Sequence, residues 1–475
     1  MKIDRDLIAI FIVDLLATSG DIALSWTSPM LPKLQSNDSS INPLGRPITK
    51  DEDSWIASLL NIVAAVGSFP FSIIADKFGR RIGLIAIAVP FIVSYLTLAM
   101  AKNLYWYYFA RAIGGLAIGG GYALLPLYIA EVSKDSNRGA MSQTLNVFWA
   151  IGNFIPYAIG PFISIFWFNV ILACLPASFL VIFSISGPES PYYLVKRNKI
   201  REAENVLMKL RSKSRDEIQS ELSCIKTNLK QDDNQQGSFF DILTNRKLLK
   251  IFIMCLILVL TQELSGFCAI MYHLEMIFAV SGTNLDSGVC ALIVGFASMI
   301  SSLISPCLID RAGRRFLIIS SCIGMFLALA LLSIFFYIQD ETDISINYIF
   351  WVPIFSLILY IFSFNFGICC VPWTLISEIF PTNVKHIAAS SITSITWITS
   401  FLTTSYYNTI NSWIGLSGTF CFYSLFCIFA AIYSTIAVPE TKNKSFSEIQ
   451  EMIQNGKVDR KTYVEGEILL HEIKT

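Results

Sequence analysis

Residues 76–81 read Asp-Lys-Phe-Gly-Arg-Arg, and residues 310–315 read Asp-Arg-Ala-Gly-Arg-Arg, 234 positions further on. Two more motifs recur at similar offsets. Glu131 and Arg138, seven residues apart, correspond to Glu378 and Lys385, 247 positions further on. Pro-Glu-Ser at 188–190 corresponds to Pro-Glu-Thr at 439–441, 251 positions further on. Self-similarity at nearly the same offset marks a chain built from repeated units. We therefore expect two related halves that run in the same direction.

The composition around these motifs is that of a membrane protein. Of 475 residues, 54% are hydrophobic and 15% are charged, whereas soluble domains carry about 25% charged residues. Lysine plus arginine and aspartate plus glutamate each number 35, so the basic excess of a nucleic-acid binder is missing. Residues 140–188 and 386–439 contain no Asp, Glu, Lys or Arg. Each stretch is long enough for two spans of about 20 residues.

The apolar runs predict an all-α membrane protein with twelve transmembrane helices in two pseudo-symmetric six-helix bundles. The expected spans are 7–30, 54–75, 82–101, 105–130, 140–162, 166–186, 249–280, 286–309, 316–338, 347–377, 387–410 and 415–438. Several exceed the minimum length, which permits tilt or breaks near the midplane. The expected units are an N-terminal half at 1–187, a linker with short helices at 188–247, a C-terminal half at 248–438 and a tail at 439–475.

Lysine and arginine in the connections predict the orientation. One side holds the long central loop with thirteen of them, besides Lys77, Arg80, Arg81, Lys134, Arg138, Arg311, Arg314, Arg315 and Lys385. The other side holds Lys33, Arg46, Lys50 and Lys102. The first side is therefore expected in the cytoplasm with both termini, in a plasma-membrane protein. Asn37 then starts an external glycosylation sequon. In the central loop, residues 201–210 predict a short amphipathic helix and residues 231–237 a flexible connection.

The ordered motifs resemble the sugar-porter branch of the major facilitator superfamily over nearly the whole chain. Besides the repeats, they are Arg111-x3-Gly115-x3-Gly119, Pro126-x-Tyr128-x2-Glu131, Gln262-x2-Ser265-Gly266, Pro372-Trp373 and residues 439–442. Residues 26–29, 54–59 and 188–194 look most like those of the insect facilitated trehalose transporters. The resemblance implies a carrier that moves trehalose or hexoses by facilitated diffusion. Its expected partners are a small sugar and the bilayer, it works as a monomer, and it needs no cofactor or metal.

The resemblance also implies a gating role for the charges at the cytoplasmic helix ends. They are Asp76, Arg80, Arg81, Glu131 and Arg138 in the first half, and Asp310, Arg314, Arg315, Glu378 and Lys385 in the second. Ion pairs there would latch the halves in one state and break in the other. The alternative is positive charge that only sets topology. For Arg111, Gly115 and Gly119 the family reading is helix packing.

The sugar site is expected between the halves, near the midplane. A sugar is bound by side chains that donate and accept hydrogen bonds and by an aromatic face. By their motif positions the candidates are Asn146, Gln262, Cys268, Tyr272, Ser298, Phe364, Asn365, Trp373, Thr396 and Trp397. For each, helix packing is the competing role. Cys268, Asn365 and Thr396 depart from the usual family residues, so the sugar itself stays open.

Two carboxyl groups inside spans leave other functions open. Asp21 or Glu263 is a possible proton site, which would make the chain a proton-coupled sugar symporter. The acid that sugar–proton symporters use in the first span aligns two residues later, with Ala23. A third alternative is a sugar sensor that does not transport. The sequence carries no Walker, Gly-x-Ser-x-Gly or zinc motif, so we expect no enzyme and no ATP-driven pump.

Overall fold

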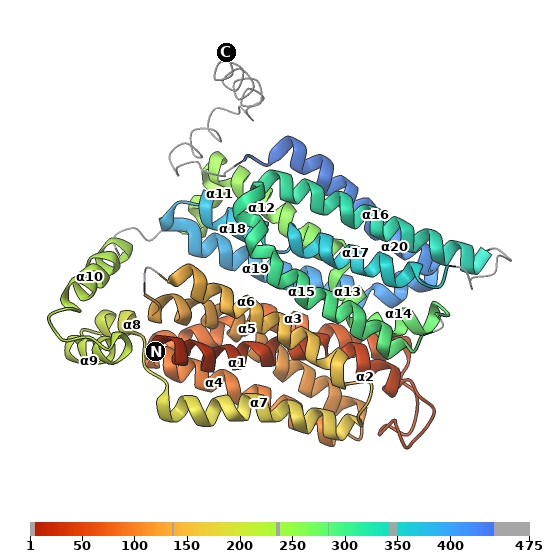
Figure 1. Cartoon of the computed structure of the whole chain (residues 1–475), viewed down its shortest axis with the longest axis horizontal. Coiled ribbons are helices and arrows are strands. Elements are labelled where there is room, and N and C mark those ends of the chain that lie inside the picture. The colour runs from red at the N-terminus through yellow and green to blue at the C-terminus, as the bar shows by residue number, and fades with distance from the viewer. Residues whose placement is uncertain (1–4, 135–136, 234–237, 284, 342–348, 441–475) are drawn as a thin grey trace, which may run out of the picture.

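The computed structural model describes residues 5–134, 137–233, 238–283, 285–341 and 349–440, and the regular secondary structure in these ranges is helical. Figure 1 shows two groups of long helices lying one above the other, with the short helices α8–α10 beside one end of the lower group. The lower group comes from the N-terminal half of the chain and the upper group from the C-terminal half. This is the twelve-helix, two-bundle architecture that the repeats predict.

The first half contains six spans, of which the first is broken into α1 and α2. Its helices are α1 (Arg5–Ser25), α2 (Thr27–Leu34), α3 (Lys50–Phe78), α4 (Arg80–Met100), α5 (Leu104–Val132), α6 (Arg138–Ile159) and α7 (Ile165–Ser186). Between the halves lie α8 (Pro191–Lys196), α9 (Ile200–Arg211), α10 (Gln219–Asp233) and α11 (Phe239–Thr244).

The second half repeats this plan, with breaks in its seventh and tenth spans and a kink at Gly415 in its twelfth. Its seventh span is formed by α12 (Arg246–Leu264), α13 (Phe267–Tyr272) and α14 (Leu274–Val280). The tenth is formed by α17 (Val352–Phe366) and α18 (Val371–Ile379). The others are α15 (Ser287–Ala312), α16 (Arg314–Glu341), α19 (Thr382–Ser405) and α20 (Tyr407–Ala437).

Ten of the spans are long and apolar enough to cross a membrane by composition, judged over the described residues, and α6 and α19 are the two that fall short. Both are nevertheless 22 and 24 residues long, enough to span. In α19 the polarity comes from serine and threonine, and Thr393, Thr396 and Thr399 each donate to a carbonyl one turn back in the same helix. Such side chains are satisfied without water. These two more polar helices line the interface between the halves, where α6 packs on α15 and α19 on α3.

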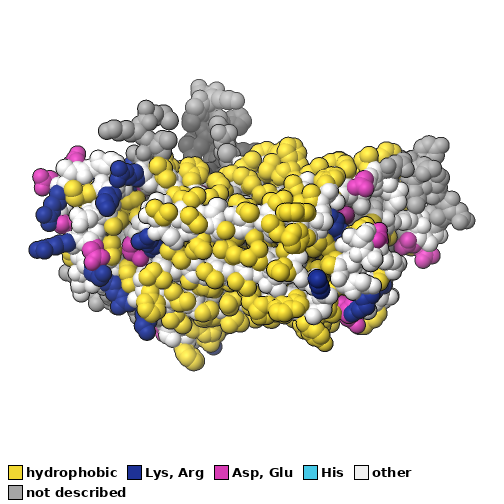
Figure 2. Space-filling view, turned by 90° about the horizontal axis from the view of Figure 1, so that it is seen from below, with side chains coloured by type: hydrophobic (Ala, Val, Ile, Leu, Met, Phe, Trp, Pro, Cys, Tyr) yellow, Lys and Arg dark blue, Asp and Glu magenta, His cyan; other side chains and the backbone are white. Residues whose placement is uncertain are grey.

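The two ends of the bundle differ in what they carry. We call the end with Gly79, Gly313 and the helices α8–α11 the motif end, and the end with the loop at 35–49 the loop end. Figure 2 shows an apolar band around the middle and charged side chains gathered at both ends. An apolar band of this kind fits the hydrocarbon layer of a bilayer. Asn37 is exposed in the loop at the loop end.

The broken spans have local causes. Gly266 separates α12 from α13 in a left-handed conformation, φ +82°, and a Cβ there would lie 2.4 Å from Cδ2 of Tyr423. Gly367 ends α17 where a Cβ would lie 2.3 Å from the carbonyl oxygen of Leu317. Because only glycine fits at both places, the seventh and tenth spans bend there. The boundary between the expected spans 387–410 and 415–438 was wrong: α19 stops at Ser405 and α20 begins at Tyr407. The expected start of the twelfth span at 415 coincides with the kink at Gly415 inside α20.

The linker helices are fastened to the first half. The predicted amphipathic helix is confirmed as α9, which buries Leu207 and Leu210. Buried Arg211 donates to the carbonyls of Val132 at 2.9 Å and Ser133 at 3.1 Å, at the end of α5. These are carbonyls that a helix end leaves without a partner. Of the expected flexible stretch, 231–233 belongs to α10 and 234–237 lies outside the described residues.

Candidate functional site

Three aromatic side chains from both halves meet in the middle of the bundle. The ring of Tyr122 on α5 stacks on that of Trp149 on α6, with centroids 4.8 Å apart and planes 10° apart. Trp397 on α19 meets the same tyrosine edge-on, at 5.4 Å and 89°. Aromatic faces in such a cluster suit the CH surface of a sugar ring. Trp397 was a sequence candidate, whereas Tyr122 and Trp149 were not.

Asp21 joins this cluster through a hydrogen bond. Tyr122 donates its hydroxyl to Asp21 Oδ1 at 2.8 Å, and the carboxyl is buried within α1. The nearby cation Arg111 does not bond to Asp21 in the described structure and donates instead to the carbonyl oxygens of Ala23 at 2.6 Å and Ile56 at 2.8 Å. Asp21 is therefore held by a neutral donor beside the aromatic rings.

A second polar group runs from the seventh span to α3 and α19. Tyr272 donates its hydroxyl to Asn61 Oδ1 at 3.0 Å, and the amide of Asn61 donates to Ser400 Oγ at 3.1 Å. Cys268 and Ser400 both interact with buried Glu263. Polar side chains of the first and second halves thus form one connected chain in the centre of the molecule. The sequence reasoning did not single out Asn61 or Ser400.

Gln262 is an amide of the seventh span that has an unused hydrogen-bond acceptor among the described residues. Its Oε1 atom is buried and has no hydrogen-bond partner in the part of the chain the structure describes. Buried polar atoms are normally satisfied, so an exception calls for an explanation such as a bound ligand. The broken helix beside it, at Ser265 and Gly266, is the type of element around which transporters build their sites.

The remaining candidates lie in contacts within one half. Asn365 donates to Ser301 Oγ at 2.6 Å and to the carbonyl oxygen of Ser298 at 3.4 Å, which ties α17 to α15. The Phe364 ring stacks on that of Phe267 at 3.9 Å. Asn146 donates to the side chain of Gln143, and Thr396 donates to the carbonyl oxygen of Ile392, each within its own helix. Trp373 is half-buried and packs against the hydrophobic core. Contacts between helices account for Asn365 and Phe364, whereas the bonds of Asn146 and Thr396 stay within their own helices.

The charged motifs form matching clusters at the motif end, each within its own half. Arg80 pairs with Glu131 at 3.1 Å and with Asp76 at 2.8 Å. In the second half Arg314 pairs with Glu378 at 2.9 Å. The next arginines, Arg81 and Arg315, donate to carbonyls at the ends of α7 and α20, at Ser184 and Thr435. Three gating candidates remain. Arg138 donates to the Ala130 carbonyl at 3.2 Å, and Lys385 is half-buried. The side chain of Asp310 lies outside the part of the chain that the structure describes.

Glu189 closes the first cluster from the linker side. Its carboxylate accepts the backbone N–H of Arg80 at 2.8 Å and of Arg81 at 3.2 Å, at the start of α4. Glu440 does the same for Arg314 and Arg315 at the start of α16, at 3.0 and 3.1 Å. Burial raises the pKa of Glu189 above its ordinary value, while hydrogen bonds from backbone N–H groups and the charge of Arg80 act in the opposite direction. The Pro-Glu motifs thus cap the helices that the repeated Gly-Arg-Arg motifs open.

Arg111 and its two glycines lie where α5 packs closely on its neighbours. The arginine is 1% exposed and lies over the ring of Trp26 at 5.6 Å. A Cβ on Gly115 would lie 2.3 Å from the Leu60 carbonyl oxygen, and one on Gly119 would lie 2.2 Å from the Ala64 carbonyl oxygen. α5 and α3 therefore touch backbone to backbone, which requires glycine at both positions.

The hydrogen bonds that the structure places between the halves lie in the middle and at the loop end. Asn408 donates to Asp53 Oδ2 at 2.7 Å, and Tyr157 donates to the carbonyl of Met271 at 3.0 Å. At the same end His273 Nε2 lies 3.4 Å from Asp53 Oδ2, with both side chains buried. The loop end is therefore closed by polar contacts of α3 with α20 and with His273, and of α6 with α13.

The chain matches the family described as Sugar (and other) transporter over residues 29–453. A facilitated trehalose transporter of Apis mellifera ligustica is 30% identical over 95% of this chain and 88% of its own length. One of Bombyx mori is 29% identical over 86% of this chain and 80% of its length. The inward open xylose transporter XylE of E. coli superimposes with TM-score 0.75 at 20% identity, covering 93% of this chain and 99% of the other. Its partially occluded inward open form gives 0.72 at 21% identity, covering 92% and 99%.

Proposed function

Because this chain belongs to the sugar (and other) transporter family, we propose that it carries a sugar across the membrane by facilitated diffusion, and that trehalose or a hexose is the substrate. The observation that carries the proposal is the contact of Tyr122 and Trp149 of the first half with Trp397 of the second. A substrate bound there would touch both halves. Movement of one half against the other around a central site is how such folds expose it alternately to each side.

The substrate would be held by the aromatic cluster and by the amides around it. The proposed hydrogen-bonding partners are Gln262, whose side-chain carbonyl oxygen has no partner among the described residues, and Asn61, which bonds to Tyr272 and Ser400. Amides both donate and accept, as do sugar hydroxyls. Asn146, Cys268 and Thr396 are further proposed contacts of the substrate. The contacts of Phe364, Asn365 and Trp373 favour a packing role for them. Ser298 takes part in this group through its backbone carbonyl, which accepts from Asn365, and its side chain stays a proposed substrate contact.

We propose that the moving units are residues 1–187 and 248–438, joined by 188–247, in a monomer of the plasma membrane. The motif end, with most of the lysine and arginine, is proposed to face the cytoplasm, which places both termini there and Asn37 outside. With the loop end sealed, this conformation would bind and release substrate on the cytoplasmic side.

The charges of the motif end are proposed to act as a gate. In this conformation Arg80 and Arg314 pair inside their own halves. Closing the motif end would bring the two clusters together, and the same arginines would then be available to the opposite half. Exchange of partners between two packed arrangements is a common device in conformational switches.

Transport and its energy source are tested together in proteoliposomes. Labelled trehalose is offered in competition with glucose, fructose and galactose, with and without an imposed pH gradient. Saturable uptake that stops at the external concentration, and that the gradient does not change, supports facilitated diffusion. Accumulation driven by the gradient, and its loss in Asp21→Asn, would instead establish a symporter. Absence of saturable uptake for all four sugars would remove the proposal.

A further inference from the structure

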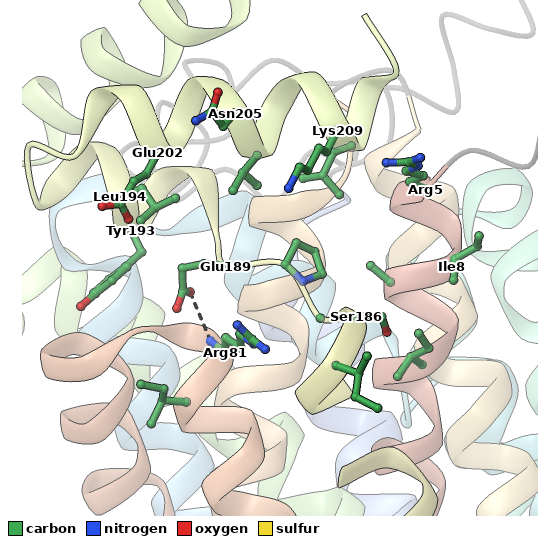
Figure 3. Close-up of a pocket in the computed structure, with 18 of the residues that line it drawn as sticks. Arg5, Ile8, Arg81, Ser186, Glu189, Tyr193, Leu194, Glu202, Asn205 and Lys209 are labelled. Atoms are coloured by element: carbon green, nitrogen blue, oxygen red, sulfur yellow. Dashed lines mark hydrogen bonds between the residues drawn. The ribbon is translucent and has the colours of Figure 1, made fainter. Parts of the chain in front are cut away.

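A cavity of about 820 Å³ lies at the motif end of the first half, away from the centre of the bundle. It is bounded by the ends of α1, α4 and α7 and is roofed by α9. Figure 3 shows Lys209 of α9 above Ser186, with Arg5 and Ile8 on one side and Arg81 and Glu189 on the other. Because its lining comes only from the first half and the linker, this cavity is separate from the proposed sugar site.

The cavity carries positive charge that the protein does not neutralise. Arg5 and Lys209 are exposed, and neither has a hydrogen bond or ion pair with any other residue that the structure describes. Arg81 uses one nitrogen on the Ser184 carbonyl, and its buried Nε atom has no partner among the described residues. The positive charge is therefore available to a ligand.

The two carboxylates of the lining are already engaged. Glu189 accepts backbone N–H groups of α4, with the Arg80 N–H at 2.8 Å, and Glu202 pairs with Lys199 at 3.1 Å. Neither would repel an anion as strongly as a free carboxylate. The lining as a whole selects for negative charge.

The floor of the cavity is apolar and includes exposed side chains of two spans. Ile8 of α1 is 46% exposed and Ile185 of α7 is 82% exposed, and both line the cavity. The neighbouring side chains Phe11 and Ile182 are also exposed, on the same two spans. In a membrane such side chains face acyl chains. A ligand with an anionic head and hydrocarbon tails would satisfy both parts of the cavity at once.

We propose that this cavity binds an acidic phospholipid of the leaflet at the motif end, with the head group between Arg5, Arg81 and Lys209 and the acyl chains along Ile8 and Ile185. In the orientation proposed above this is the cytoplasmic leaflet, where acidic lipids gather. A free anion such as phosphate would use the cations but leave the apolar floor uncovered. Because Arg211 fastens α9 to the end of α5, the roof is in place before the lipid arrives.

The test is native mass spectrometry of the purified full-length chain in detergent, titrated with phosphatidylserine or phosphatidylcholine. The charge variant is Arg5→Gln with Lys209→Gln. Its matched control is Lys247→Gln with Lys250→Gln, which removes two exposed cations at the same end of the second half. Ser186→Phe keeps every charge and fills the cavity at an exposed position. Glycerophosphoserine, the head group without tails, is added as a competitor at the lipid concentration.

The expected result is phosphatidylserine binding that is about tenfold weaker in the charge variant and in Ser186→Phe, and unchanged in the control. Phosphatidylcholine binds equally weakly to all four proteins, and the free head group does not compete. Equal loss in variant and control would mean diffuse surface attraction and would overturn the proposal. So would full binding by Ser186→Phe, or competition by the free head group, which would mark an anion site without a lipid.

Discussion

A Cβ atom on Gly79 would lie 2.1 Å from Oε2 of Glu189. Gly79 has φ +114° and ψ 156°, a region of backbone conformation that is essentially restricted to glycine. The absence of a side chain lets Glu189 reach the backbone N–H groups that open α4. In the second half a Cβ on Gly313 would lie 2.9 Å from Oε2 of Glu440. In each half, the Gly-Arg-Arg motif requires glycine at its first position because the glutamate of the Pro-Glu motif occupies the space of a side chain there.

Replacement of this glycine is therefore expected to destabilise the fold. Gly79→Ala should lower the free energy of unfolding by roughly 2–3 kcal/mol, because backbone strain and displacement of the Glu189 carboxylate add. The readout is the thermal melting midpoint of the purified protein in detergent. Gly139→Ala is the control, since nothing lies within 4 Å of a Cβ there. A Gly79→Ala protein with the same melting midpoint as Gly139→Ala would show that the close approach of Glu189 to Gly79 does not affect stability.

The pair Arg80 and Glu131 should be energetically coupled. Their side chains are only 9% and 11% exposed, so solvent screens the 3.1 Å pair weakly. A double-mutant cycle with Arg80→Gln and Glu131→Gln, read by unfolding in detergent, should give a coupling of at least about 1 kcal/mol. The same cycle on Lys199 and Glu202, which are more than half exposed, should give a value near zero. Equal coupling in the two cycles would contradict the account.

Close packing of α5 on α3 predicts a graded response to alanine along one helix. Gly115→Ala should cost about 2 kcal/mol or more, because its Cβ would lie 2.3 Å from the Leu60 carbonyl oxygen. Gly121→Ala, six residues further along α5, meets its nearest neighbour at 3.6 Å and should be tolerated. Melting curves of the two variants decide the point. Comparable melting midpoints would mean that the helices separate easily.

Arg111 should not be replaceable by lysine. Its guanidinium donates from three nitrogens to the carbonyls of Ala23, Ile56 and Ala57, which one ammonium group does not reproduce. Arg111→Lys is expected to lower the stability by on the order of 3 kcal/mol. Arg201→Lys, exposed on α9, is the control and should leave the melting midpoint unchanged. An unchanged midpoint in Arg111→Lys would assign the arginine a role other than packing.

The sequence predicts the fold well because its signals are local. Hydropathy finds the spans, and the repeated Gly-Arg-Arg motifs at 79–81 and 313–315 mark equivalent helix starts in the structure. The end of the eleventh span was wrong because serine, threonine and aromatic residues continue without a charge from α19 into α20. No composition change marks the turn at Tyr406.

The site was harder to predict because its residues are defined by partners far away in the chain. Tyr122 lies in an apolar stretch of α5 where one tyrosine gives no signal, and only the fold places it against Trp397. Asn61 is a buried amide within a span, which could have been singled out by the rule that identified Asn146. Conversely, Asn365 was chosen by its position in a motif, but its bonds to α15 are those of a packing residue.

The central claim is that a sugar passes between the halves at the aromatic cluster, and uptake by Trp397→Ala tests it most directly. Labelled trehalose, glucose, fructose and galactose are offered to proteoliposomes of the wild type, this variant and Trp413→Ala, whose side chain is 79% exposed on α20. We predict saturable uptake of at least one sugar by the wild type and Trp413→Ala, and a KM raised about tenfold or lost uptake in Trp397→Ala. Uptake by Trp397→Ala equal to the wild type, or no saturable uptake by the wild type, would contradict the account.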